Sequence, residues 1–333
     1  MRSAFALLIL LVLLAFGLSA GAAQSAARAP EPSPFEEKNY ARLADWAKGH
    51  NLELCWLKRE ETLQLSTPSA KVVLGIDSRE AHLNGVLVWL AFPLVYHNGA
   101  VYIAQLDLQT TLQPLLWPPK GRSGPRIRAV CLDPGHGGKD PGNRVGSKEE
   151  KKFTLLLARE VRDQLKRAGL KVLLTRSTDS FVELPNRPEL AKRRSADLFV
   201  SLHFNAAEHN RESVKGAEVY CLTPPGASST NARGEAADTA WCAGNRSNER
   251  NLLLAYQVQK ALTQNLCVED RGVRRARFAV LREAVMPAVL IEAGFMSHPG
   301  EGGKIFTEAY RRQMARAIVE GLLAYKRAVE LGG

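Results

Sequence analysis

Several features that would place this 333-residue chain in a familiar class are missing from its sequence. After residue 22 no apolar run is long enough to span a bilayer, so we expect no membrane-spanning helix beyond that point. No two cysteines have C-x-x-C spacing, which counts against a zinc site built from cysteines. The glycine-rich run at 135–142 lacks the G-x-G-x-x-G spacing, and no Ser or Thr follows Gly138-Lys139. Neither of the common phosphate-binding loops is therefore present.

Cysteine is also scarce, and its count is odd. The five are Cys55, Cys131, Cys221, Cys242 and Cys267. In an oxidising compartment an odd count leaves at least one thiol unpaired or bonded to another molecule. Cys55 and Cys131 lie in apolar segments typical of strands, so we expect both to be buried as small hydrophobic residues. Pairing among the other three is open.

The first residues predict export. Arg2 precedes an almost wholly apolar run, and Ala20-Gly21-Ala22 offers a small-residue cleavage site. We expect a signal peptide at 1–22 and a flexible leader at 23–34, which would place the protein in the periplasm or cell-wall space without a stable membrane anchor. An uncleaved anchor is the alternative interpretation.

The charge balance is basic, with a formal net charge of +11. An excess of this size favours anionic partners, which for an exported protein are wall polymers or membrane surfaces rather than nucleic acid. The densest basic cluster consists of Arg271, Arg274, Arg275 and Arg277. A solvated face is at least as good an interpretation of this cluster as a binding role.

The chain is long enough for two domains, and its pattern predicts a small α+β domain at 35–117. A helix is expected at about 39–48, followed by strands near 52–57, 62–66 and 71–76. The dipeptides Asn84-Gly85 and Asn98-Gly99 lie between apolar runs and indicate hairpin turns. A stretch rich in proline and glycine at 118–125 is typical of a linker.

From 126 to 333 apolar strands alternate with helices, which predicts an α/β domain. Its expected fold is a mainly parallel, twisted sheet with helices on both faces. The amphipathic pattern at 151–168 indicates the first helix, with Gly169 as its end. Residues 223–250 are small and polar, and we expect a long loop there with little fixed structure.

Polar residues follow three of the expected strands. His136 comes after the strand ending near Leu132, His203 after 197–202, and Glu292 after 287–291. Residues beyond the carboxyl ends of parallel strands converge on one edge of the sheet, where ligands bind. Two imidazoles and a carboxylate at that edge would suit a metal ion. Each of them also has a purely structural interpretation, as a hydrogen-bonded histidine or a carboxylate satisfying a loop.

Glu150 is a fourth candidate, and its spacing favours a different role. The run Ser147-Lys148-Glu149-Glu150 is a capping-box pattern that would place Glu150 at the third position of the following helix. From spacing alone, a helix cap is the better interpretation and a metal ligand the alternative.

The second domain resembles the zinc-dependent N-acetylmuramoyl-L-alanine amidases of the amidase-3 family, from about Ile127 to Tyr325. The motifs that carry this resemblance are Leu132-Asp133-Pro134-Gly135-His136-Gly137-Gly138, Lys148-Glu149-Glu150-Lys151, the run 196–206 through His203, Gly216-Ala217-Glu218-Val219-Tyr220, and the run 288–297 through Glu292. The resemblance implies one Zn²⁺ ion held by His136, Glu150 and His203, with Glu292 as the catalytic carboxylate. The double Glu149-Glu150 departs from the usual single Glu and leaves Glu149 open as the ligand. Arg187 and Asn205 are candidates for orienting neighbouring groups, and either has a purely structural alternative.

The activity that the resemblance implies is hydrolysis of the amide bond between N-acetylmuramic acid and L-alanine in peptidoglycan. A zinc peptidase acting within the stem peptide and a non-catalytic wall-binding protein are the alternatives. Some family members carry an autoinhibitory helix over the zinc and respond to an activator protein at the division site. The stretch 223–250 has little apolar periodicity, so we expect no stable occluding helix there. The first domain more loosely resembles the N-terminal domain of copper amine oxidases.

Overall fold

The computed structural model describes residues 39–118, 126–231 and 240–330. The predicted signal peptide at 1–22 and the leader at 23–34 lie outside the described residues, as does nearly all of the linker at 118–125.

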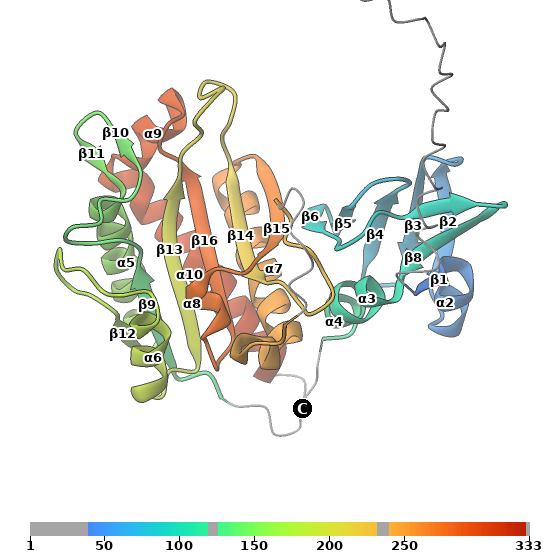
Figure 1. Ribbon diagram of the computed structural model, residues 1–333, viewed down its shortest axis with the longest axis horizontal. Coiled ribbons are helices and arrows are strands. Elements are labelled where there is room, and N and C mark those ends of the chain that lie inside the picture. The colour runs from blue at the N-terminus through green and yellow to red at the C-terminus, as the bar shows by residue number, and fades with distance from the viewer. Residues whose placement is uncertain (1–38, 119–125, 232–239, 331–333) are drawn as a thin grey trace, which may run out of the picture. The chain divides into compact units, whose positions relative to one another are not determined.

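Eleven strands form the main sheet, in the order β12-β9-β13-β16-β14-β15-β6-β5-β4-β3-β2 (Figure 1). The strands of its first half are β12 (Lys171–Leu174), β9 (Ala129–Pro134), β13 (Leu198–Asn205), β16 (Ala288–Phe295), β14 (Ala217–Leu222) and β15 (Asp270–Ala276). Neighbours in this half are parallel, except that β14 runs antiparallel to β16. The strands of the second half, β6 (Val86–Trp89), β5 (Glu80–Leu83), β4 (Lys71–Gly75), β3 (Thr62–Ser66) and β2 (Glu53–Lys58), are antiparallel to one another.

Helices cover both faces of the first half, as the sequence predicts. The long helices α5 (Glu150–Arg167), α7 (Asn248–Leu266) and α10 (Glu308–Glu330) pack on one face. The shorter helices α6 (Asn186–Arg193) and α8 (Ala279–Arg282) pack on the other, and α9 (Pro299–Ile305) follows β16. β9 and β14 are apolar except for Asp133 and Glu218, because both of their faces are buried. The predicted fold class is confirmed.

Alternation along the strands decides which side chains face the shorter helices. Leu198, Val200 and Leu202 of β13 belong to the core under the long helices, whereas Phe199 belongs to the core under α6 and α8. Since the side-chain period of a strand is two, His203 lies on the same face as Phe199. The polar side chains of the site described below lie on this second face.

The residues before the linker contain a second, three-stranded sheet, β1-β8-β7, besides their share of the main sheet. Its strands are β1 (Tyr40–Arg42), β8 (Ala100–Ala104) and β7 (Val95–His97). The helical segments here are α2 (Leu43–Gly49), α3 (Gln105–Asp107), η1 (Leu108–Leu112) and α4 (Gln113–Leu116). Below, residues 39–118 are called the small region. Both predicted hairpin turns are confirmed, with positive φ at Asn84 and Asn98.

Two local predictions for the small region are wrong. The first helix begins at Leu43 rather than near residue 39, because residues 40–42 pair with β8 as a strand. Cys55 is exposed rather than buried. It lies on β2, which is the edge strand of the main sheet and has solvent on both of its faces. An apolar-looking run therefore does not guarantee burial at a sheet edge.

The small region joins the main sheet through β15, a strand that the sequence pattern does not reveal. Val88 of β6 pairs in parallel with Val273 of β15, and residues Lys38–Gly333 form one compact unit. Five of the seven residues of β15 are charged or glycine, which hides it from a search for apolar runs. The boundaries of the two predicted domains stay predictions.

The remaining predictions concern cysteines, helices and the polar stretch. All five cysteines are free thiols, and Cys131 is buried as expected. Among the described residues no helix combines the length and the apolar character needed to cross a membrane. Part of the stretch 223–250 has regular structure, because a 3₁₀ helix at Ala243–Ser247 leads into α7. Residues 232–239 lie outside the described residues, so the expectation about an occluding helix stays a prediction.

Candidate metal centre and active site

His136 lies on the loop that follows β9, with a left-handed backbone at φ 60°. Its Nδ1 lies 2.8 Å from Oδ2 of Asp140, four residues on. With Nδ1–H donating to this carboxylate, Nε2 is left free to act as a ligand, and the ring orientation is fixed. Nε2 lies 3.1 Å from Oε2 of Glu150.

Glu150 is the first residue of α5, and its side chain points into the site instead of capping the helix. The structure shows no side-chain cap at this end of α5, and residues 148–149 form the short strand β11. The capping-box interpretation is therefore wrong. The carboxylate is only 1% exposed and accepts hydrogen bonds from the backbone N–H groups of Asn143 (2.9 Å) and Phe204 (3.0 Å). Its Oε1 lies 3.0 Å from Nδ1 of His203.

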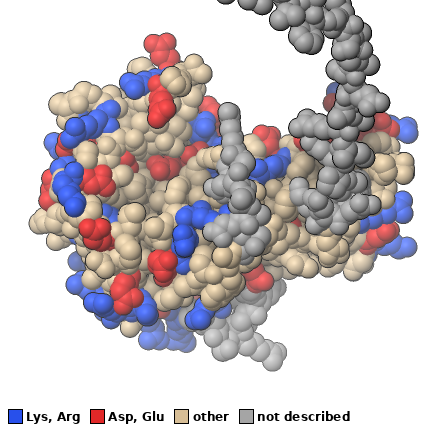
Figure 2. All heavy atoms as spheres, in the orientation of Figure 1, with Lys and Arg blue, Asp and Glu red and all other residues tan. Residues whose placement is uncertain are grey.

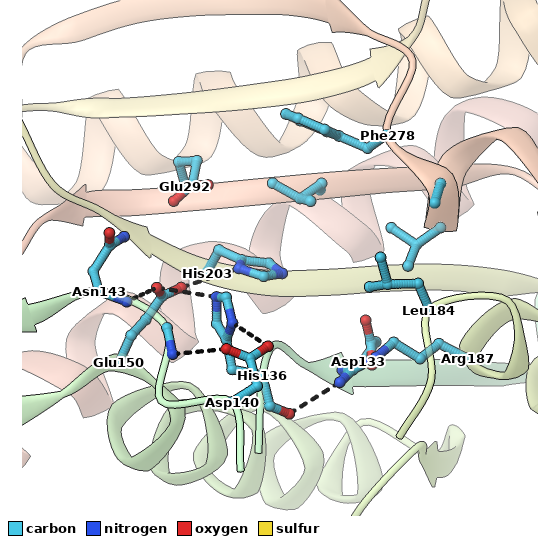
Figure 3. A pocket seen from close by; sticks show the side chains of 14 residues that line it. Asp133, His136, Asp140, Asn143, Glu150, Leu184, Arg187, His203, Phe278 and Glu292 are labelled. Atoms are coloured by element: carbon cyan, nitrogen blue, oxygen red, sulfur yellow. Dashed lines mark hydrogen bonds and ion pairs between the residues drawn. The ribbon is translucent and has the colours of Figure 1, made fainter. Parts of the chain in front are cut away.

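The side chains of His136, Glu150 and His203 come together at one point (Figure 3). One ligand atom from each lies within 4.8 Å of the others. Two imidazole nitrogens and one carboxylate oxygen form a donor set that zinc prefers, and three protein ligands leave a coordination position for water or substrate. The geometry and chemistry of these residues fit the implied ion.

Electrostatics within this group favour a charged carboxylate. Burial alone would raise the pKa of Glu150, but its contacts with His136 and His203 outweigh burial and lower the pKa below the usual value. Burial would likewise lower the pKa of His136, and the carboxylates of Glu150 and Asp140 reverse this and raise it. Glu150 is thus held as a carboxylate, the form that binds metal.

Gly142 lies against the side chains of Glu150 and His136, and its replacement is our first prediction. A Cβ at Gly142, where φ is +65°, would lie 2.6 Å from both Oε2 of Glu150 and Cδ2 of His136. Gly142→Ala should therefore displace these side chains and weaken zinc binding by about 10-fold or more, as changes next to metal ligands do. Zinc affinity measured by competition with a chelator tests this.

Gly146 provides the matched control. It has a similar φ of +57°, but nothing lies within 4 Å of its Cβ position. Gly146→Ala carries the same backbone cost of about 1–2 kcal/mol without the contact. Equal zinc affinities for the two variants would contradict the prediction.

Glu292 lies beside His203 on the neighbouring strand. The two residues are register partners in the parallel pair β13–β16. Both strands continue for two or more residues beyond the predicted ends, so His203 and Glu292 lie within strands and not past their ends. The sequence pattern placed His203 and Glu292 just beyond the ends of their strands, and that detail of the prediction is wrong. Strand pairing nevertheless brings the two side chains together.

The carboxylate of Glu292 shares a cavity of about 430 Å³ with the His136, Glu150 and His203 side chains. Its Oε2 is buried and has no hydrogen-bond partner among the described residues. Burial, reinforced by the negative charges of Glu150 and Glu218, raises the pKa of Glu292 well above its usual value. A carboxyl group with a raised pKa beside a candidate metal site is a candidate for proton transfer. Apolar side chains also line the cavity, Leu184 and Phe278 among them (Figure 3).

Arg187 supports the loop that carries His136 and does not reach the ligand atoms. Its Nη1 donates to Oδ1 of Asp133 (2.8 Å), and its Nη2 donates to the carbonyl of His136 (3.0 Å). Both partners of the ion pair are almost fully buried. Arg176, which the sequence interpretation missed, donates to the carbonyls of Pro134 and Gly135 on the same loop.

Removing the Arg187 charge should therefore destabilise the fold. Arg187→Met leaves Asp133 buried without its cation, and losing one partner of a buried pair typically costs about 3–5 kcal/mol. Arg193, on the same helix, is 73% exposed and pairs with Glu189, so Arg193→Met should cost less than about 1 kcal/mol. Urea unfolding of both variants measures the difference, and similar free energies of unfolding would argue against a bracing role.

Asn205, the other candidate, contacts a second buried carboxylate. Its Nδ2 donates to Oε1 of Glu218 (2.9 Å), and so does the hydroxyl of Tyr220 (2.9 Å). Arg271 and Arg274 contact the other oxygen of Glu218 at 3.1 and 3.0 Å. Asn205 thus orients Glu218, which pairs across the strands with Glu292.

The basic cluster is not a solvated face. Arg274 and Arg275 are buried, and Arg271 binds a buried acid. On the face in Figure 2, Lys and Arg side chains are interspersed with Asp and Glu rather than gathered into one basic surface. The sequence interpretation missed Glu218 as the partner of these arginines, because Glu218 lies more than fifty residues before them in the chain. The only available signal was a single Glu in an apolar strand.

A family model described as N-acetylmuramoyl-L-alanine amidase matches residues 130–324, more than half of the chain. The chain belongs to this amidase family. The predicted family and enzyme class are thus confirmed. The match begins at residue 130, so the resemblance of residues 35–117 to the copper amine oxidase domain stays a prediction.

Individual members of the amidase family agree with this result. The amidase AmiC of Neisseria meningitidis is 36% identical over 244 residues, which span 67% of this chain and 57% of that protein. The amidase AmiA of Escherichia coli K12 is 36% identical over 234 residues, spanning 62% of this chain and 79% of that protein. The solved structure of the amidase AmiC2 of Nostoc punctiforme is 34% identical, with a TM-score of 0.50, and covers 61% of this chain and 98% of that chain. The chain thus spans little more than half of the Neisseria relative.

Proposed function

We propose that this member of the amidase family hydrolyses the amide bond between N-acetylmuramic acid and L-alanine in peptidoglycan, with one zinc ion held by His136, Glu150 and His203. The observation that carries the proposal is the placement of the unpaired Oε2 of Glu292 in the same cavity as these three side chains. Glu149 is not a ligand in this proposal, because its side chain contacts Arg144 and Lys151 outside the cluster.

Each residue has a role that follows from its contacts. A bound zinc ion supplies Lewis acidity, which makes a water molecule more acidic and polarises the amide carbonyl. Glu292 accepts the proton of the attacking water at its unpaired Oε2 and later passes it to the departing amine of L-alanine. Asp140 holds the ring of His136 in place, and Arg187 holds the backbone beneath it.

The cavity has the right character for this amide. Its lining combines polar side chains, among them the candidate ligands and Glu292, with the apolar side chains of Leu184, Phe278 and Leu290. The lactyl group and L-alanine each carry one methyl group next to the scissile amide. The apolar side chains of the cavity can accept these methyls.

Digestion of purified peptidoglycan by the protein tests the proposal. Release of free stem peptides with an L-alanine amino terminus, sensitive to a chelator and restored by zinc, is the expected result. Shorter peptides cut within the stem would instead indicate a zinc peptidase. Binding to the polymer without any product would indicate a wall-binding protein, and either result would overturn the proposal.

The place and regulation of the activity are part of the same proposal. A peptidoglycan substrate requires export, in keeping with the predicted signal peptide at 1–22. The protein would act in the periplasm or cell-wall space, with an activator protein at the division site as a candidate partner. The low apolar periodicity of residues 223–250 supports a site that is not covered by an inhibitory helix.

A further inference from the structure

The small region contacts the catalytic part through an unusually close strand junction. Gly272 of β15 has φ +88°, and a Cβ there would lie 2.7 Å from Cγ of Leu87 and 3.0 Å from Cδ1 of Trp89. The backbone N–H of Leu87 donates to Oδ2 of Asp270 (2.8 Å). Only glycine permits this approach, so β15 is shaped to receive β6.

Trp89, the last residue of β6, contacts two arginines of β15. Its Nε1 donates to the carbonyl of Arg271 (3.0 Å). The guanidinium of Arg274 lies over its ring, 5.0 Å from the centroid, a cation–π contact. Trp89 therefore limits where the Arg274 side chain can lie. Trp89 itself belongs to the small region, far from the catalytic residues in sequence.

Arg274 in turn belongs to a closed ring of polar contacts around Glu218. Its Nε lies 3.0 Å from Oε2 of Glu218, and its Nη1 donates to Oδ1 of Asn231. Asn231 donates to the hydroxyl of Tyr220 (2.8 Å), which donates to Oε1 of Glu218 (2.9 Å). Glu218 is only 2% exposed, so these donors fix both of its oxygens.

Glu218 lies directly beside the proposed catalytic carboxylate. In the sheet, Glu218 pairs with Glu292 across β14–β16, and Glu292 pairs with His203 across β16–β13. Opposed side chains in such pairs have Cβ atoms about 4.5–5.5 Å apart. The arginines contact the Glu218 carboxylate from β15 and balance its charge, and Glu218 is not among the residues that line the cavity of Glu292.

We propose that Trp89 is a positioning residue for the amidase reaction, acting through Arg274 and Glu218 on Glu292. The small region is then a working part of the catalytic unit rather than a separate wall-binding module. This inference rests on the proposed function. Direct partners of metal ligands typically change activity by 10–100-fold, and because Trp89 acts through further residues we expect a loss at the lower end of this range, about 10-fold.

The test compares Trp89→Leu with Trp56→Ala in the full chain. Trp56 lies on the edge strand β2 of the same region and is 42% exposed, with Tyr96 as its ring neighbour. A soluble muramyl peptide serves as substrate, and zinc content and melting temperature are measured for every variant. We expect Trp89→Leu to lower kcat about 10-fold with KM and zinc content unchanged, and Trp56→Ala to leave kcat unchanged.

Conservative and double variants separate positioning from general damage. Trp89→Phe keeps a ring face for Arg274 and should restore most of kcat. The single variant Arg274→Gln should also lower kcat. The double variant, with Trp89→Leu added, should lose little more kcat than Arg274→Gln, because both changes act on one chain of contacts. Should Trp89→Leu fail to fold, the kcat of Arg274→Gln decides the question in its place.

The outcomes distinguish this inference from the proposed function. An active wild-type protein whose Trp89→Leu variant matches Trp56→Ala, or whose folded Arg274→Gln variant keeps full kcat, would overturn the inference alone. Additive losses in the double variant would also overturn it. A wild-type protein that releases no peptides with an L-alanine amino terminus would overturn the proposed function, and this inference with it.

Discussion

Glu292→Gln should abolish measurable turnover while leaving zinc bound. The amide keeps the size of the side chain but cannot accept the proton of the attacking water. Positioned proton transfer contributes about 10²–10⁴-fold to a rate, so we expect a loss of at least about 100-fold in kcat. The buried Oε2 of Glu292 has no hydrogen-bond partner among the described residues, so its replacement leaves the candidate ligand set of His136, Glu150 and His203 unchanged. Peptide release from peptidoglycan and zinc content by atomic emission measure the two quantities.

Glu283→Gln is the matched control for this experiment. Glu283 is an exposed carboxylate between α8 and β16, only nine residues away in sequence. Its replacement removes the same charge and should leave turnover unchanged. Turnover of Glu292→Gln within a factor of a few of wild type would rule out Glu292 as the proton acceptor, even if the protein proves to be a zinc amidase.

Glu150→Gln should release the zinc ion. Both oxygens of Glu150 take part in the cluster, one toward His136 and the other toward His203, and the side chain is buried. A neutral amide binds zinc poorly, and two histidines alone form an incomplete site. Because changes one step removed from a ligand already cost 10–100-fold in affinity, we expect the loss of a ligand to exceed about 100-fold. Activity should fall with zinc content and recover only at high added zinc.

Glu149→Gln gives the comparison that separates the two adjacent carboxylates. Glu149 contacts Arg144 at 2.9 Å and Lys151 at 3.5 Å, and both contacts lie near the surface. Exposed ion pairs contribute about 0–1 kcal/mol, so its removal should change neither zinc content nor activity appreciably. If Glu149→Gln lost zinc and Glu150→Gln retained it, the ligand set would have to be reassigned.

Much of the fold was predictable because burial leaves a simple pattern in the sequence. β9, β13, β14 and β16 are apolar throughout or nearly so, and α5 has a clear four-residue apolar spacing. β15 was not predictable in this way. Its arginines are buried because they meet Glu218, the Trp89 ring and backbone carbonyls, and those partners are distant in sequence.

The site was predictable to the extent that strand direction decides it. His136, His203 and Glu292 come from neighbouring strands, so their convergence follows from a parallel sheet. Glu150 was different. Its local spacing favours a helix cap, and only the family resemblance pointed to the cluster where the structure places it. The roles of the bracing residues Asp140, Arg176 and Glu218 could not be assigned from the sequence, because they depend on contacts formed after folding.

The junction between β6 and β15 also has a consequence for how the chain assembles. The hydrogen bond from Leu87 to Asp270 closes a loop of 183 positions, whereas the β5–β6 hairpin forms around the local turn at Asn84-Gly85. Pairings between distant segments form slowly, so we expect β6 to be present as an open strand edge well before β15 arrives. An open edge can pair with the wrong chain. The β6 edge therefore stays unpaired until β15 has folded beside it, and during this time it is a site where aggregation can begin.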